Sequence, residues 1–235
     1  MQGYTRRQLK QDKFAETTQE AMHWASGHQR PVVWGVALII IAAAAYFGGT
    51  TWIDHQNELA NAGLTASFRT LTEPLRPADA PAGQGTGYTT SAERAKAAAK
   101  QFQDLAGKFS YTKAGRVAHY MQGVALVQAG DNAAAEQQLK SVADSRDKDV
   151  AALAKLALAS LYRSTNRPAD AVRLYKDLQD HPSSTVSKPE AQLEMAELYE
   201  KTDPTQAMNI YQQIQKEDPI GPAAQIAGAR MNSVK

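Results

Sequence analysis

The chain has 235 residues, of which 43% are apolar and 21% charged, proportions that allow a buried core and exclude fibrous and wholly disordered proteins. It contains no cysteine, which excludes disulfides, cysteine-bound zinc or iron–sulfur sites and thiol catalysis. Its formal net charge is only +2, and since no stripe of alternating basic and aromatic residues accompanies it, we expect no binding of nucleic acid.

Residues 1–30 are expected to form a short tail ahead of the first apolar segment. Phe14, Thr17, Ala21, Met22 and Ala25 recur there at helical spacing. The pattern is compatible with an amphipathic helix at the membrane interface and equally with a solvated tail.

Residues 31–53 are predicted to form a transmembrane anchor. They include no charged residue, and on a helix they span roughly 35 Å against an apolar bilayer core of about 30 Å. Trp34 and Trp52 stand near the two ends, where indole rings favour the membrane interface. Two alternatives remain: a buried core helix, and a cleaved signal peptide whose processing site would lie in the alanine run 42–45.

The basic residues near this segment predict its orientation. Five of them precede it, whereas only Arg69 lies in the twenty residues that follow. The positive-inside rule therefore places residues 1–30 in the cytoplasm and residues 54–235 outside it.

Two segments are expected between the anchor and the main domain. Residues 54–73 keep the apolar spacing of a helix and are predicted to extend the anchor. Residues 74–91 are rich in proline and glycine and are predicted to form a linker. The glycines at 83, 85 and 87 resemble a phosphate-binding loop only superficially, because no strand precedes them and no Lys-Ser/Thr pair follows.

Residues 92–235 are predicted to form a repeat domain. Ala135, Ala171 and Ala207 are separated by 36 residues each. Further positions repeat with them, namely Leu139, Tyr175 and Tyr211, then Val142, Leu178 and Ile214, with Gly123, Ala159 and Ala196 ahead of the alanines. Each repeat is therefore a helical hairpin in which a small residue lets two helices approach.

The predicted turns fall between the two helices of each hairpin. They are Gly130-Asp131-Asn132, Asn166-Arg167-Pro168 and Thr202-Asp203-Pro204. In the third turn, Asp203 is expected to cap the second helix and Pro204 to lie in its first turn.

At Gly123, Ala135 and Leu139 and their successors, the sequence resembles the tetratricopeptide repeat. The usual tryptophan is replaced by His119 and Lys155, and the period is 36 residues instead of 34. The resemblance implies an all-α fold, a tetratricopeptide-like α-solenoid of about three helical hairpins plus flanking helices, to which the predicted anchor adds one N-terminal transmembrane helix.

A second resemblance covers nearly the whole chain. The short tail, the single anchor and a domain with the segments 111–118 (YTKAGRVA) and 133–139 (AAAEQQL) resemble the YfgM-like family of bacterial inner-membrane proteins. This resemblance implies an inner-membrane protein with a periplasmic C-terminal domain, associated with the Sec translocon and periplasmic chaperones.

Patterns typical of enzymes are weak, so we expect no catalytic residues, cofactor or metal. The five histidines have no metal-ligand spacing. Ser145 and Lys148 match a Ser-x-x-Lys pattern, but they are expected in a charged connector away from any pocket. Glu190, Glu194 and Glu197 are expected to form a solvated acidic stripe.

The resemblance to tetratricopeptide repeats implies that the first helices line a concave face that binds protein chains. The candidate face comprises Val117, Tyr120, Val124, Val127, Leu153, Leu156, Ser160, Arg163, Leu193, Glu197 and Lys201. Alternatively, residues 92–109 or 220–235 pack over these side chains and make them part of the core.

The expected function is a non-enzymatic, membrane-anchored protein-interaction module. Its expected partners are translocon components, chaperones or exported chains, with membrane lipid contacted through the single span. Two alternatives stay open: a scaffold for envelope assembly or division, and a signalling protein whose tail holds a cytoplasmic regulator. The sequence leaves the oligomeric state undetermined.

Overall fold

The computed structural model describes residues 29–77 and 87–233, and every regular element within them is an α-helix. The chain divides into two compact units, Met1–His55 and Gln56–Lys235. The predicted amphipathic tail helix and the glycines at 83 and 85 lie outside the described residues.

Helix α2 (Gln29–Thr72) contributes the described part of the first unit. Its large apolar side chains there are exposed, with Trp34 71% and Trp52 56% exposed. No residue of its most apolar stretch is buried, and the helix is long and apolar enough to cross a membrane. This exposure contradicts the alternative of a buried core helix, whereas a signal sequence would share the same properties.

In the second unit, the residues of α2 from Gln56 onward pack against α3 (Ser91–Lys108) and α4 (Lys113–Gln128). The ring of Phe68 meets that of Phe102 edge-on, with 5.4 Å between the ring centres. The N-terminal core is built mainly from small side chains, which let the helices come close. It consists of Ala60, Leu71, Ala95, Ala98, Ala99, Phe102, Leu105, Ala106, Phe109, Ala114, Ala118 and Ala125.

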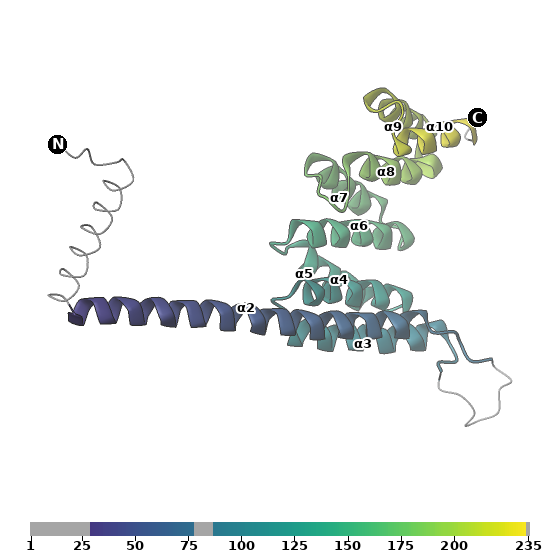
Figure 1. Cartoon of the computed structure of the whole chain (residues 1–235). Coiled ribbons are helices and arrows are strands. Elements are labelled where there is room, and N and C mark those ends of the chain that lie inside the picture. The colour runs from purple at the N-terminus through teal and green to yellow at the C-terminus, as the bar shows by residue number, and fades with distance from the viewer. Residues whose placement is uncertain (1–28, 78–86, 234–235) are drawn as a thin grey trace, which may run out of the picture. The chain divides into compact units, whose positions relative to one another are not determined.

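Three helical hairpins follow one another in chain order (Figure 1). Helix α4 pairs with α5 (Asn132–Ala143), α6 (Lys148–Ser164) with α7 (Pro168–Asp180), and α8 (Lys188–Thr202) with α9 (Pro204–Glu217). Helix α10 (Pro222–Ser233) then packs on α9 and α8. The predicted all-α fold of about three hairpins with flanking helices is confirmed.

The repeated positions fill the space between the helices. Ala135, Ala171 and Ala207 are completely buried. The larger residues that repeat with them are buried as well: Leu139, Tyr175, Tyr211, Val142, Leu178 and Ile214. They belong to the repeat core, the cluster of buried apolar side chains that runs from Ala135 in α5 to Ala227 in α10.

Gly123 allows the closest approach within the first hairpin. A Cβ atom at this position would lie 2.6 Å from Cδ2 of Leu139, which is itself completely buried. A larger residue would therefore push α4 and α5 apart.

The turns inside the hairpins explain the spacing of the repeats. Gly130 and Asn166 adopt left-handed φ angles of 81° and 58°, and the residue after each donates its backbone N–H to a carbonyl in the preceding helix. In the third turn, Asp203 alone separates α8 from α9, and its side chain accepts a hydrogen bond from the N–H of Gln206. Pro204 opens α9, as predicted, and this turn is shorter than the other two.

Candidate functional site

The candidate face lies on the first helices of the three hairpins. Helix α4 supplies Val117 to Val127, α6 supplies Leu153 to Arg163, and α8 supplies Leu193 to Lys201. Helices α4 and α6 are in contact, and α6 is joined to α8 by ion pairs of Arg163. The structure thus places the predicted residues on the first helices of three successive hairpins.

At the α4 end, the candidate face is apolar. Val117, Tyr120, Val124 and Val127 follow the 3-4-3 spacing of one helix face, and each is half-buried. Burial raises the pKa of the Tyr120 hydroxyl, so this side chain stays neutral.

The α6 residues continue this apolar surface toward α8. Leu153 and Leu156 are half-buried and pack against the repeat core, whereas Ser160 is exposed. At the position equivalent to Val127, α6 has Arg163 and α8 has Glu200. The face therefore changes from apolar to charged along the stack.

The flanking helices leave the apolar part of the face half-exposed. Helix α3 packs on the side of α4 that carries Ala114, Ala118 and Ala125. Val117, Tyr120 and Val127 pack instead against the repeat core. Helix α10 buries Ala224 and Ala227 in that core beside α8 and α9. The α4 part of the face thus keeps exposed surface, and the alternative in which the flanking segments cover the face stays a prediction.

At the α8 end, the face is a network of paired charges. A guanidinium nitrogen of Arg163 lies 3.3 Å from Glu194 and 3.6 Å from Glu197. Arg230 of α10 donates a 2.8 Å hydrogen bond to Glu197 and lies 3.9 Å from Glu200. Two guanidinium groups paired with three carboxylates reduce the net field that this end presents to a partner.

This network corrects the predicted acidic stripe. The side chains of Glu194 and Glu197 are only 34% and 31% exposed, and both contact Arg163. Burial raises the pKa of the Glu194 carboxyl, and the charge of Arg163 opposes that rise. Glu190 is exposed, and its side chain accepts from the backbone N–H of Ser187 in the capping box of α8. The sequence analysis missed Arg230, which lies beyond the last repeat and has no periodic partner.

A cavity of about 660 Å³ opens at this charged end. Its lining comes mainly from α6, α8 and α10, and includes Ser160, Arg163, Glu197, Lys201 and Arg230. The candidate face thus offers half-buried apolar side chains at one end and donors and acceptors of both charges at the other. Such a surface suits a polypeptide segment.

The described residues give little support to enzymatic chemistry. They include no group of three histidine, aspartate or glutamate residues placed to hold a metal ion. Ser145 and Lys148 do line a cavity of about 340 Å³ with His181, which corrects the expectation that they lie away from a pocket. The Ser145 hydroxyl, however, donates to the carbonyl of Asp147, so it is not hydrogen-bonded to a base as an activated nucleophile would be.

Comparison with known proteins agrees with this architecture. Residues 23–177 match the tetratricopeptide repeat-like domain family, over a range that includes the apolar segment, α3 and the first two hairpins. Residues 190–219 match the tetratricopeptide repeat and cover most of the third hairpin. No curated protein and no solved structure matches the chain.

Proposed function

The chain belongs to the tetratricopeptide repeat-like domain family, and from this premise we propose that it is a membrane-anchored module whose candidate face binds a segment of a partner protein. Tetratricopeptide repeats are protein-interaction domains, and they are typically non-enzymatic. The partner lies along α4, α6 and α8, with its apolar side chains against the α4 end.

One observation carries the proposal: the apolar row of α4 keeps exposed surface although helices flank the repeats on both sides. Tyr120 and Val124 are half-buried, while α3 packs on the alanines of α4 and α10 contacts the face at its charged end, through Arg230 and Glu197. Apolar and aromatic side chains at the centre of an interface contribute most of its binding energy. The α4 row therefore acts as the anchor of the interface.

The resemblance to the YfgM-like family supports the location and the partners. We place residues 31–53 of α2 in a bacterial inner membrane, with residues 1–30 in the cytoplasm and the repeat domain in the periplasm, as the basic residues ahead of the span favour. The proposed partners are the Sec translocon, periplasmic chaperones and exported chains. The module gathers them where newly exported proteins leave the membrane.

Co-purification of the full chain from gently solubilised membranes tests this proposal. We expect the double variant Val124→Ser with Leu156→Ser to lose translocon and chaperone components that the wild type retains. The matched control changes Val172 and Leu174 to Ser on α7, since these two residues are half-buried but lie outside the candidate face. The control should retain the same components.

Circular dichroism of both variants separates lost binding from lost folding. The proposal is overturned if the Val124/Leu156 variant stays helical and still co-purifies with the same components. It is also overturned if the wild type captures envelope-assembly or division proteins in place of the translocon, which would establish the scaffold alternative.

A further inference from the structure

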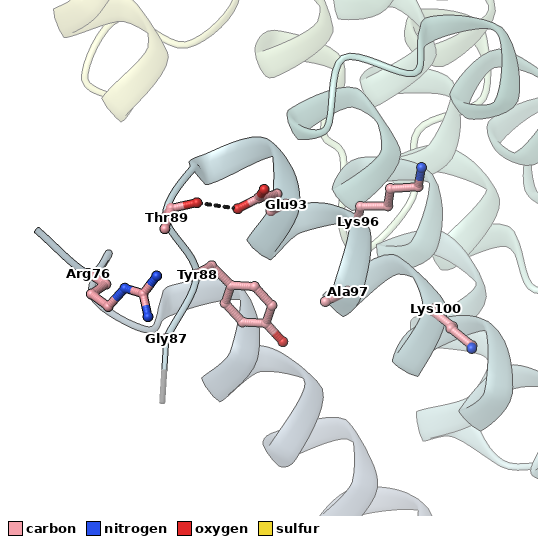
Figure 2. Close-up of a pocket in the computed structure, with 8 residues that line it drawn as sticks. All are labelled: Arg76, Gly87, Tyr88, Thr89, Glu93, Lys96, Ala97 and Lys100. Carbon is pink, nitrogen blue, oxygen red and sulfur yellow. Dashed lines mark hydrogen bonds between the residues drawn. The ribbon is translucent and has the colours of Figure 1, made fainter. Parts of the chain in front are cut away.

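Another cavity lies where α2 ends and α3 begins, away from the candidate face. Its volume is about 530 Å³, and its lining includes Arg76, Tyr88, Glu93, Lys96 and Lys100 (Figure 2). The backbone N–H of Arg76 donates a 2.9 Å hydrogen bond to the carbonyl of Tyr88. This bond ties the two chain segments that form one wall of the cavity.

The charge of this cavity is unbalanced. Arg76, Lys96 and Lys100 line it, and among residues 29–77 and 87–233 none of them forms an ion pair. Lys96 and Lys100 are one turn apart on α3, where like charges repel each other. These three cations therefore lack an ion-pair partner within the described part of the chain.

The one carboxylate in the lining is already engaged. Glu93 accepts hydrogen bonds from the Thr89 hydroxyl at 2.6 Å and from the backbone N–H of Thr90 at 3.3 Å, as part of the capping box of α3. These hydrogen bonds, that of Thr89 first, hold the pKa of Glu93 below its ordinary value. The carboxylate of Glu93 is hydrogen-bonded at the N-terminus of α3, so the three cations are able to pair with a ligand.

The arrangement of the cations indicates the shape of that ligand. Figure 2 shows Arg76 on one side of the Tyr88 ring and the two lysines on the other. These cations come from two chain segments, and in this view the aromatic ring lies between them. Such an arrangement suits a ligand that carries several negative charges along an extended chain, with a part that covers the aromatic ring.

We propose that this cavity is a second binding site, which takes an acidic, extended peptide segment of a partner protein. Carboxylates pair with the guanidinium of Arg76 and with the ammonium groups of Lys96 and Lys100. The ring of Tyr88 packs against the aliphatic or backbone part of the peptide. Since none of these residues belongs to the candidate face, the site goes beyond the proposed function and adds a charged contact to an apolar one.

Fluorescence anisotropy of the full chain in neutral phosphatidylcholine nanodiscs tests the proposal. The probe is a fluorescein-labelled peptide of alternating glutamate and alanine, and its glutamine–alanine counterpart is the uncharged comparison. We expect the double variant Lys96→Gln with Lys100→Gln to bind the acidic probe about five-fold more weakly, as two partly exposed ion pairs allow. Added salt should weaken binding by the wild type more than by the variant.

The matched control is the double variant Lys176→Gln with Lys216→Gln. It removes the same charge from exposed positions on α7 and α9 that lie outside this cavity. This control and the Val124/Leu156 variant of the candidate face should both bind the acidic probe like the wild type. Failure of the proposed function and failure of this site can therefore be told apart.

Three outcomes overturn the proposal. The first is that the wild type does not bind the acidic probe, and the second is that both lysine double variants bind it equally well. The third is that phosphatidylglycerol vesicles compete with the probe, and that Lys96→Gln with Lys100→Gln weakens binding of the vesicles but not binding of the probe. That result would assign the cavity to an anionic lipid surface.

Discussion

The N-terminal core and the repeat core are both formed by packed helices, but different side chains fill them. In the N-terminal core, Phe102 of α3 is surrounded mainly by alanines of α2, α3 and α4. In the repeat core, Leu139, Tyr175 and Tyr211 occupy one repeated position and pack beside a repeated alanine. The buried residues of the N-terminal core therefore follow no repeat in the sequence, whereas those of the repeat core recur at a fixed interval.

Helix α4 belongs to both cores, which makes it the connection between them. Its alanines at 114, 118 and 125 face the N-terminal core, while Gly123 contacts Leu139 of the first hairpin. In stacked helical repeats each unit contacts mainly its neighbours, so stability is a sum of local terms. We therefore expect damage in one core to reach the other only through α4.

The largest expected effect comes from Phe102→Ala. Phe102 is completely buried, and removing a buried aromatic ring costs about 3–5 kcal/mol of the free energy of unfolding. Hydrogen exchange followed by mass spectrometry should show lost protection in α3 and in α2 from Gln56 onward. The amides of α7 to α9 should keep most of their protection.

The exposed neighbour Gln103 provides the control, since Gln103→Ala removes a side chain from the same helix without opening the core. An equal loss of protection in both cores after Phe102→Ala would contradict the comparison. It would show that the second unit unfolds as one cooperative body.

A smaller effect is expected from Ala171→Phe in the repeat core. Ala171 is completely buried between the helices of the middle hairpin, and overpacking of this kind costs about 1–3 kcal/mol. Thermal melting followed by circular dichroism should show the loss. Ala169→Phe adds the same ring at an exposed position two residues earlier and should melt like the wild type. Equal melting of both variants would contradict the repeat register.

The periodic core was predictable from the sequence because its side chains repeat. The interval from Ala135 to Ala171 and Ala207 located the hairpins, and a run of turn residues marked each loop. The packing of α2 on α3 has no such signal. Both segments show a helical apolar pattern, but nothing in it indicates that Phe68 contacts Phe102 across a proline- and glycine-rich connection.

The candidate face was predictable to a similar extent. Its apolar members in α4 and α6 follow from the helical spacing once the register of the hairpins is known. The pairing of Arg163 with Glu194, and of Arg230 with Glu197, depends on where long side chains end in space. Sequence spacing constrains Cβ positions and leaves those ends free, so a solvated stripe was expected where paired charges lie.

The smallest expected effect concerns Asp147, which joins α4 to α6. Its carboxylate accepts a 2.7 Å hydrogen bond from Nε of Arg116 and a second from the N–H of Val150, so it also caps α6. The hydrogen bond from Arg116, more than any other contact, holds the pKa of Asp147 below its ordinary value. The ion pair thus links α4, which contacts both cores, to the start of α6, which belongs to the repeat core.

Because the pKa of Asp147 is lower in the folded chain than in the unfolded chain, its charged form stabilises the fold above the unfolded-state pKa, and that stability is lost as the pH falls through the folded-state pKa. We expect Asp147→Asn to lower the free energy of unfolding at neutral pH by up to about 1 kcal/mol, since the Arg116 side chain is 40% exposed. In urea titrations of the full chain in detergent at several pH values, the difference between variant and wild type should shrink as the solution becomes acidic. Asp144→Asn, at an exposed position in the same connector, removes an equal charge and should leave stability nearly unchanged. A difference for Asp147→Asn that persists unchanged at acidic pH would contradict the assignment of this stability to the charge of Asp147, since asparagine caps a helix about as well as aspartate.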